Sequence, residues 1–177
     1  MVRFPAAYRL LAALLWRLLS PKSQLRRAFL RRQLVSAYAA ASRRDYELML
    51  VRYAPDVELE YDPDFEPLGL GGTFRGHAGF LKFLETWSEA WEEWEARPAF
   101  VIDLGDRGMG LGHVRLPGTA SGMVLEREFA QLITPRRGLV ASEREFMSWE
   151  KGLRAAGLDP NSMALPSRGG GDQVDAV

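Results

Sequence analysis

The stretch Gly71–Trp94 reads GGTFRGHAGFLKFLETWSEAWEEW and predicts the helix around which the chain folds. After the glycine pair and the segment Phe74–His77, apolar residues recur at helical spacing. They are Phe80, Phe83, Leu84, Trp87, Trp91 and Trp94. Residues at these intervals share one face of a helix with 3.6 residues per turn. An inward face with three tryptophans needs a large concave surface to cover, and we expect the rest of the chain to supply it.

Strand patterns lie on both sides of this helix. Short turns separate four predicted strands downstream, which are Arg97–Leu104, Met109–Leu116, Met123–Thr134 and Leu139–Met147. Short turns between consecutive strands indicate an antiparallel meander, and long twisted strands favour a curved sheet. Upstream, Val57–Tyr61 alternates apolar with acidic residues, which predicts a half-buried strand. The proline- and glycine-rich residues 62–72 predict an irregular loop.

Three further helices complete the predicted fold. Apolar residues keep helical spacing from Leu25 to Ala41, and four arginines of this segment are predicted to form its solvated face: Arg26, Arg27, Arg31 and Arg32. A short helix follows the N-cap residue Asp45 and carries Tyr53 inward, and a last helix spans Trp149–Ala156. This order of elements predicts an α+β fold, with a cone-like curved antiparallel sheet and helices on its concave face.

The length of 177 residues indicates one domain with extensions. We predict an N-terminal extension over residues 1–22, a cone domain over residues 23–158 and a disordered polar tail over residues 159–177. Residues 6–19 form an amphipathic helix too short to span a bilayer. It packs on the domain or a partner, lies on an anionic membrane surface, is a weak signal-like segment, or is an upstream segment with little role in determining the structure. We favour docking on the domain or a partner.

Composition excludes several classes of site and partner. The chain has no cysteine and two histidines, so we expect neither a disulfide nor a metal site. It carries no P-loop, dinucleotide fingerprint or nucleophile elbow, so we expect no cofactor. Residues 1–44 hold ten basic and no acidic side chains, whereas the remainder holds 13 basic and 23 acidic ones. An acidic body argues against a nucleic-acid partner, and we expect a cytoplasmic protein, with peripheral membrane contact through residues 1–22 as an alternative.

Four short motifs resemble one known family in their order and spacing. They are Arg43–Glu58 at the opening unit, Phe74–His77 before the long helix, Ser121-Gly122 before the third long strand, and Leu153–Leu158 at the end of the last helix. Together they cover about Leu25–Leu158, and the chain resembles a SnoaL-like domain of the nuclear transport factor 2-like superfamily. One departure is Ser148-Trp149, where many SnoaL-like relatives carry an acidic residue just before the last helix.

The resemblance implies a cone with a pocket but no single reaction, because the superfamily includes isomerases, cyclases, hydrolases, dehydratases and non-catalytic modules. It also implies a homodimer formed through the convex sheet face. By the same likeness, the strand faces that carry Glu128 and Arg144 turn inward. Strand alternation then pairs these two side chains inside the pocket, as a proton-transfer carboxylate with its arginine. A structural ion pair and an exposed pair on the outer face are the alternatives, and we favour these two over the catalytic interpretation.

The remaining candidate residues have both functional and structural interpretations. His113 has the intrinsic pKa of a general base but no assigned acidic partner, so a strand-surface position is the alternative. His77, at the start of the central helix, is better explained as an anchor. The side chains expected to line the ligand pocket are aromatic: Tyr38, Tyr53, Tyr61, Trp87, Trp91 and Phe146.

Two hypotheses for function follow from these patterns. The first is a cone that binds a small hydrophobic molecule and carries out cofactor-independent proton transfer of the isomerase, cyclase or hydrolase type. In it, Glu128 or His113 acts as the base and Arg144 orients the carboxylate. The alternative is a non-catalytic dimeric interaction module whose N-terminal helix docks on a partner or a membrane.

Overall fold

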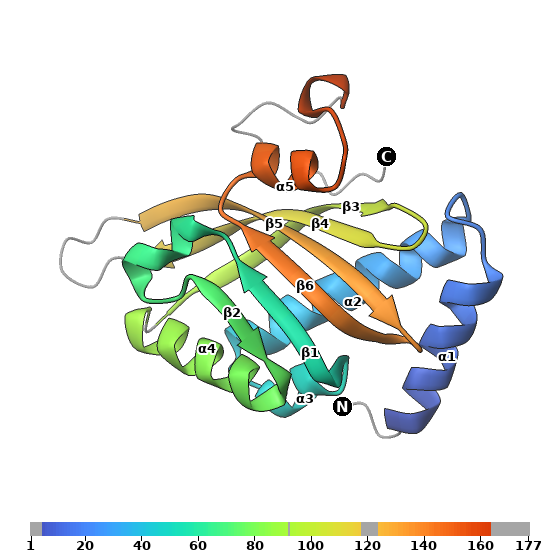
Figure 1. Cartoon of the computed structure of the whole chain (residues 1–177), viewed down its shortest axis with the longest axis horizontal. Helices are drawn as coiled ribbons and strands as arrows, with labels where there is room; N and C mark the ends of the chain where they lie inside the picture. The colour runs from blue at the N-terminus through green and yellow to red at the C-terminus, as the bar shows by residue number, and fades with distance from the viewer. Residues whose placement is uncertain (1–4, 92, 118–123, 164–177) are drawn as a thin grey trace.

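A six-stranded sheet organises the molecule, in the order β2-β1-β6-β5-β4-β3 (Figure 1). The computed structural model describes residues 5–91, 93–117 and 124–163. The strands are β1 (Tyr53–Tyr61), β2 (Gly72–Arg75), β3 (Glu95–Asp103), β4 (Gly108–Pro117), β5 (Val124–Arg136) and β6 (Leu139–Phe146). Neighbouring strands of the described chain pair antiparallel, apart from β1 and β6, which run parallel. The four-stranded meander is confirmed, whereas the pairing that joins it to β1 makes the sheet mixed.

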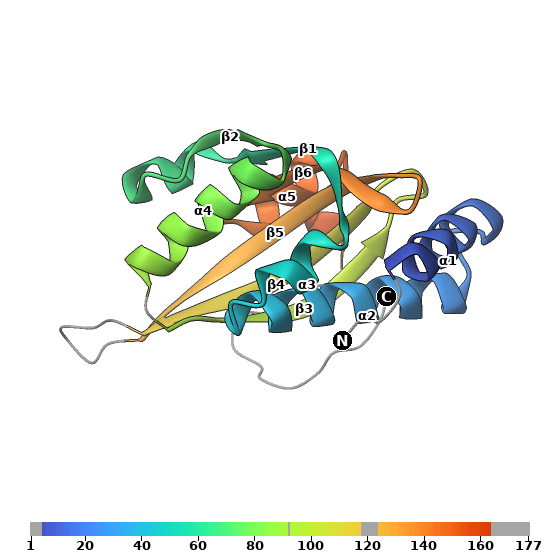
Figure 2. The ribbon, with the colours of Figure 1, turned by 90° about the horizontal axis from the view of Figure 1, so that it is seen from below.

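Helices cover both faces of the sheet. They are α1 (Pro5–Leu18), α2 (Gln24–Ser42), α3 (Tyr46–Leu50), α4 (Gly76–Ala90) and α5 (Trp149–Ala155), with 3₁₀ turns at Pro63–Leu68 and Pro160–Ser162. The face toward α2 and α4 is called the inner face, and the opposite one the outer face (Figure 2). The α+β architecture is confirmed, but α5 lies on the outer face rather than beside the other helices. The motif Ser121-Gly122 and the tail from residue 164 lie outside the described residues.

The central helix α4 is shorter than the stretch that predicts it. It begins at Gly76, whose φ of +65° is accessible to glycine at little cost, and it ends at Ala90. Trp91 is extended at the C-cap position, so Trp94 follows the helix instead of lying on it. The Trp94 ring nevertheless packs edge-on against Trp87, with centroids 5.9 Å apart. Trp87 on α4 and Trp94 in the connection after α4 therefore both pack into the core.

The segment before α4 also differs from the predicted pattern. Helix α3 ends at Leu50, and Tyr53 begins β1 instead of completing the helix. The predicted loop at residues 62–72 is a 3₁₀ turn that leads into the short edge strand β2. His77 Nε2 lies 3.1 Å from the Tyr53 carbonyl oxygen. His77 therefore anchors the start of β1 to the first turn of α4, as its position in the sequence indicates.

Alternating glycines let α2 approach the sheet closely. Gly110 faces the inner side of β4, where an added Cβ would lie 2.7 Å from a methyl group of Leu34. At Gly112 an added Cβ would lie 2.5 Å from both the Phe129 ring and the Arg97 carbonyl oxygen. These distances are too short for non-bonded atoms. A side chain at position 110 would therefore push α2 away from the sheet, and one at position 112 would clash with β3 and β5.

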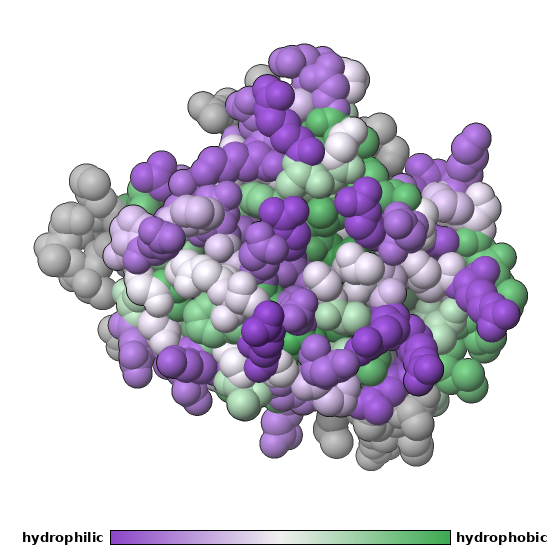
Figure 3. Space-filling view, in the orientation of Figure 1, coloured by the Kyte–Doolittle hydropathy of each residue, from purple (hydrophilic) through white to green (hydrophobic). Residues whose placement is uncertain are grey.

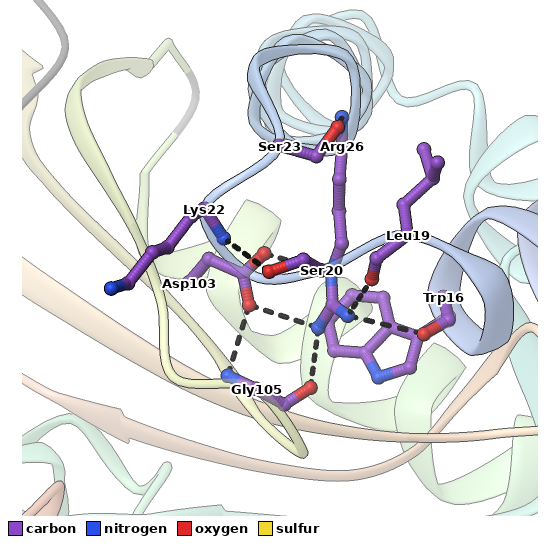
Figure 4. Close-up of polar contacts among 8 residues, drawn as sticks. All are labelled: Trp16, Leu19, Ser20, Lys22, Ser23, Arg26, Asp103 and Gly105. Carbon is purple, nitrogen blue, oxygen red and sulfur yellow. Dashed lines mark hydrogen bonds and ion pairs between the residues drawn. The ribbon is translucent and has the colours of Figure 1, made fainter.

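Arg26 fastens α1 to the rest of the molecule (Figure 4). Its Nη1 donates to the carbonyl oxygens of Trp16 and Leu19, at 3.1 and 2.9 Å, where α1 ends. Its Nη2 donates to Asp103 Oδ1 at 2.9 Å and to the Gly105 carbonyl oxygen, and its Nε lies 2.8 Å from Asp103 Oδ2. The prediction of a solvated Arg26 is wrong, because this side chain is 4% exposed. A cation there compensates both the unpaired carbonyls at the helix end and the buried Asp103.

Candidate functional site

A cavity of about 60 Å³ lies between α2, α4 and the inner face of the sheet. We call it the cone cavity. Most of its lining is apolar and aromatic: Tyr38, Ala41, Met49, Tyr53, Tyr61, Phe65, Phe80, Phe83, Leu84, Trp87, Trp94, Ala96, Val114, Phe129 and Met147. Three polar side chains complete it, and they are Gln131, Glu143 and Glu145. The cavity thus combines an apolar body with a few polar groups, which is the composition typical of small-molecule sites.

Stacked aromatic rings form one wall of the cone cavity. Phe83 and Trp87 are four residues apart on α4, so their rings lie on one face with centroids 6.2 Å apart. Tyr61, at the end of β1, stacks on Phe83 with a centroid distance of 3.8 Å and an interplanar angle of 15°. Such a wall offers flat surfaces to a flat ligand.

Two carboxyl groups project into this aromatic cavity. Glu143 and Glu145 are two positions apart on β6, and strand alternation therefore places both on the inner face. The Tyr53 hydroxyl donates to Glu143 Oε2 at 2.7 Å, and Gln131 donates to the same carboxylate. Among the described residues, no lysine, arginine or histidine forms an ion pair with either glutamate. The pair is therefore held by neutral donors rather than by a cation.

Burial changes the protonation of both glutamates. It raises the pKa of Glu143 from 4.5 to about 7, although the hydrogen bonds from Tyr53 and Gln131 favour the carboxylate. Burial also raises the pKa of Glu145 well above its ordinary value, and the neighbouring charge of Glu143 raises it further. The two groups titrate as a pair, and at neutral pH the pair retains a proton. A carboxylate with fixed donors beside a protonated carboxyl is an arrangement suited to general acid–base chemistry.

Three buried indole donors around the cone cavity have no hydrogen-bond partner in the described part of the chain. They are the Nε1 atoms of Trp87, Trp91 and Trp94. Trp87 and Trp94 line the cavity itself. A buried polar group without a partner costs stability, and native structures usually satisfy it with protein, water or ligand atoms. The cavity is thus equipped to donate hydrogen bonds to an occupant.

No group of three or more histidine, aspartate or glutamate side chains in the described residues is arranged to hold a metal ion. The cone cavity itself brings together only Glu143 and Glu145 as acidic side chains.

The sequence-predicted candidates Glu128, Arg144 and His113 lie on the outer face. Glu128 Oε2 accepts a hydrogen bond from the backbone nitrogen of Trp149 at 3.1 Å, where α5 begins. His113 packs against the Trp149 ring, with centroids 4.8 Å apart. Arg144 Nη2 lies 3.2 Å from Glu60 Oε1, so its carboxylate partner is Glu60 rather than Glu128.

The expected inward orientation of Glu128 and Arg144 is therefore wrong. The side chains of each strand alternate as predicted, but the face that carries Glu128 and Arg144 is the outer one. The outer face of these strands is also apolar, because Ala130, Leu132 and Phe146 pack there against α5. A period of two separates the faces of a strand without identifying which face lines a cavity. Sequence reasoning missed Glu143 and Glu145 because a buried glutamate resembles a surface one in a single sequence.

The aromatic predictions divide in the same way. Tyr38, Tyr53, Tyr61 and Trp87 line the cone cavity. Trp91 packs against the core without lining the cavity, and its ring centroid lies 6.4 Å from that of Trp87. Phe146 belongs to the outer cluster beneath α5, so its predicted place in the pocket lining is wrong. Four of the six aromatic predictions therefore lie in the cavity lining, and Trp91 and Phe146 do not.

Comparison with known proteins agrees with this geometry. Residues 34–143 match the family model of the SnoaL-like domain. The chain belongs to the SnoaL-like domain family. The resemblance inferred from the sequence motifs is thereby confirmed. A search of curated protein sequences found no match.

Solved structures of SnoaL-like and NTF2-like proteins share the fold. TerC co-crystallised with polyporic acid is 26% identical, with a TM-score of 0.59 over 70% of this chain and 95% of TerC. An NTF2-like protein of unknown function from Burkholderia pseudomallei K96243 is 25% identical, with a TM-score of 0.60 over 70% of this chain and 94% of that one. An NTF2-like protein from Burkholderia xenovorans LB400 is 28% identical, with a TM-score of 0.51 over 70% and 93%.

Proposed function

We propose that this SnoaL-like protein binds a flat, apolar molecule with oxygen acceptors in the cone cavity and exchanges a proton with it. The observation that carries the proposal is Glu143, a carboxyl that is 2% exposed, has no cationic partner in the described chain and lies on an aromatic cavity wall. Burying such a group costs stability, so a catalytic use explains it better than a structural one does. The polyporic acid co-crystallised with the similar TerC supports a small-molecule occupant.

The proposed step is proton abstraction next to a carbonyl group. The Glu143 carboxylate takes the proton from the C–H bond, and the electron pair of that bond moves onto the carbonyl oxygen. Donors in the lining, Trp87 Nε1 and Trp94 Nε1 among them, stabilise the resulting oxyanion. Where a C=C bond lies next to the deprotonated carbon, the resulting dienolate takes the proton back at the far end of that bond, and the double bond shifts into conjugation with the carbonyl group. Glu145 keeps a second proton in the site for an oxygen that must be protonated.

This proposal predicts base-catalysed hydrogen exchange on a small ketone. In D₂O, the protein is expected to accelerate deuterium incorporation at C3 of butanone, a ketone small enough to be matched to a cavity of about 60 Å³, and NMR measures this exchange directly. Glu143→Gln is expected to lower the protein-dependent rate by roughly 10²-fold or more, because the base is lost while the shape is kept. The control is Glu126→Gln, an exposed glutamate on β5. Equal rates for wild type and Glu143→Gln would rule out the proposed base.

A second proposal concerns α1, which displays apolar side chains to solvent. Leu10 is 63% and Leu18 70% exposed, and Leu11 and Leu14 of the same helix are exposed as well. Hydrophobic residues accordingly gather at the right edge of the space-filling view, where α1 lies (Figure 3). Helix α1 carries no acidic residue. We propose that this surface contacts an anionic membrane from one side, as amphipathic interfacial helices do. No described helix has the length and hydropathy needed to cross a membrane.

Sedimentation with lipid vesicles tests the role of α1. The protein is expected to bind vesicles that contain phosphatidylserine more tightly than vesicles of phosphatidylcholine alone. The double variant Leu10→Gln/Leu18→Gln is expected to reduce binding by about tenfold, since two apolar side chains no longer enter the interface. Val124→Gln, an exposed apolar position on β5, serves as the control. Unchanged binding of the double variant would count against the proposal.

The homodimer through the convex sheet face stays a prediction. Helix α5 covers part of this outer face with Leu153, and its C-cap residue Ala156 packs there too. A dimer would therefore use the part of the face outside α5, and light scattering of the purified protein counts the subunits.

A further inference from the structure

A second cavity, of about 90 Å³, lies between α1, α2 and the inner face of the sheet, beyond the cone cavity. We call it the α1 cavity. Its apolar lining comes from Ala12, Trp16, Phe29, Leu30, Leu34, Ala37, Val101, Met109, Ile133, Pro135, Leu139 and Val140, together with glycines 108, 110 and 138. Its polar lining comes from Tyr8, Gln33, Arg52, Tyr53 and Gln131. The cavity is apolar at its centre and carries one cationic side chain.

Arg52 is a buried cation without a counter-charge. The residue is 7% exposed, and three of its five N–H groups donate to neutral acceptors. The acceptors are Gln33 Oε1 at 3.2 Å, the Leu48 carbonyl oxygen at 2.6 Å and Ser36 Oγ at 2.7 Å. Within the described residues, no carboxylate lies within ion-pair distance of Arg52. A buried guanidinium ordinarily pairs with an anion, because neutral hydrogen bonds repay only part of its lost hydration.

The charge of Arg52 acts on the side chains around both cavities. Burial raises the pKa of Tyr8 above its ordinary value, and the positive charge of Arg52 opposes this rise. The Tyr8 hydroxyl donates to Gln33 Oε1 at 3.0 Å, the same oxygen that accepts from Arg52 Nε. Tyr8 belongs to α1 and Gln33 to α2. The polar end of the α1 cavity is therefore a hydrogen-bond network that joins both helices to the start of β1.

We propose that the α1 cavity is a binding site for a short-chain monocarboxylate, whose carboxylate pairs with Arg52 and whose alkyl chain packs on the apolar lining. The anion would supply the missing counter-charge and would accept hydrogen bonds from the remaining N–H groups of the guanidinium. The cavity is only about 90 Å³, so the proposal is restricted to short alkyl chains. Butyrate combines a carboxylate with a short apolar chain and serves as the probe.

This site is independent of the proton transfer proposed for the cone cavity. Tyr53 and Gln131 line both cavities and form the partition between them. The five tryptophans of the chain distinguish the two sites experimentally. Trp16 lines the α1 cavity, Trp87 and Trp94 line the cone cavity, and Trp149 packs on the outer face. Their indole N–H signals in a ¹H–¹⁵N NMR spectrum therefore report occupancy at separate places.

Titration of the full-length ¹⁵N-labelled protein with sodium butyrate tests the proposal. We expect the Trp16 indole signal to shift and saturate, while the Trp149 signal stays in place. Matched titrations with 1-butanol and butylammonium keep the alkyl chain but remove or reverse the charge, and they are expected to leave Trp16 unshifted. A Trp16 signal that does not respond to millimolar butyrate, or that responds equally to butanol, would overturn the proposal.

Two variants separate a specific site from general ion binding. Arg52→Met is expected to weaken butyrate binding by about tenfold or more, because one charge-assisted interaction is lost. Its control is Arg32→Met, an exposed arginine on α2 outside the cavity lining. Ala12→Leu is expected to abolish binding by filling the cavity from α1, and it leaves Arg52 in place. If Arg52→Met does not fold, the butyrate affinity of Ala12→Leu tests the proposal instead. An affinity equal to that of the wild type would overturn it.

Discussion

Replacing Glu143 by glutamine is expected to raise the free energy of unfolding by roughly 3 kcal/mol at pH 8 while changing it little at pH 4. Burial raises the pKa of Glu143 from 4.5 to about 7 in the folded protein, so the folded state binds its proton more tightly than the unfolded chain does. The associated stability is fully present below pH 4.5 and is lost as the pH rises through 7. Glutamine has nearly the same shape, and its amide oxygen can still accept the Tyr53 hydrogen bond.

Urea unfolding at a series of pH values measures this effect. The wild type is expected to lose stability between pH 5 and 8, and Glu143→Gln is expected to show a flatter profile. A residual slope is expected from Glu145, whose pKa is also raised by burial and by its neighbour. Glu126→Gln, at an exposed position on β5, should leave the profile within about 0.5 kcal/mol of wild type. A wild type that gains stability from pH 5 to 8 would contradict the burial of an unpaired carboxyl.

The local patterns in the sequence predicted most of the fold. The apolar stripe of α4 has a period that only a helix satisfies, and Phe80, Phe83, Leu84 and Trp87 are buried as predicted. The turns of the meander are short, which restricts consecutive strands to antiparallel pairing. The parallel pairing of β1 with β6 joins segments about 80 residues apart, so no local pattern encodes it.

The candidate site required information that strand alternation does not contain. Both faces of β5 and β6 are covered, one by α2 and α4 and the other by α5, so both carry apolar residues. On β6, Phe146 faces α5 while Glu143 and Glu145 face the cone cavity. A burial rule based on hydrophobicity therefore selects the wrong face, because the apolar side chain packs against a helix and the acidic ones line the cavity. Functional sites are where such local rules are expected to fail.

Arg26 illustrates the same limit for helices. Arg26 and Arg27 are adjacent and look equivalent in a basic, amphipathic pattern, yet the first is buried and the second is not. The partners of Arg26 are the end of α1 and Asp103, which lies 77 residues downstream. Only the docking of α1 brings them together, so a tertiary contact overrides the pattern of the helix.

Replacing Arg26 by methionine is therefore expected to destabilise the protein by about 3–5 kcal/mol, since it leaves Asp103 buried without its cationic partner. The Asp103 side chain is 2% exposed, and its remaining hydrogen bond in the described chain comes from the Gly105 backbone nitrogen at 3.0 Å. Urea unfolding at pH 7 measures the loss. Arg32→Met, on the exposed face of the same helix, is the matched control and is expected to change stability by less than about 0.5 kcal/mol.

The double variant Arg26→Met/Asp103→Leu distinguishes two costs of losing Arg26. One is the loss of its attraction to Asp103, and the other is the burial of Asp103 without a counter-ion. If the buried charge is the main cost, removing both partners is expected to recover most of the stability that Arg26→Met loses, because neither apolar side chain needs a counter-ion. The α1 carbonyls of Trp16 and Leu19 still lose their donor in this variant. Trypsin cleavage after Arg17 should therefore stay faster than in wild type, even where global stability returns. Equal cleavage rates in wild type and both variants would show that packing of Trp16 and its neighbours, rather than Arg26, holds α1 on the domain.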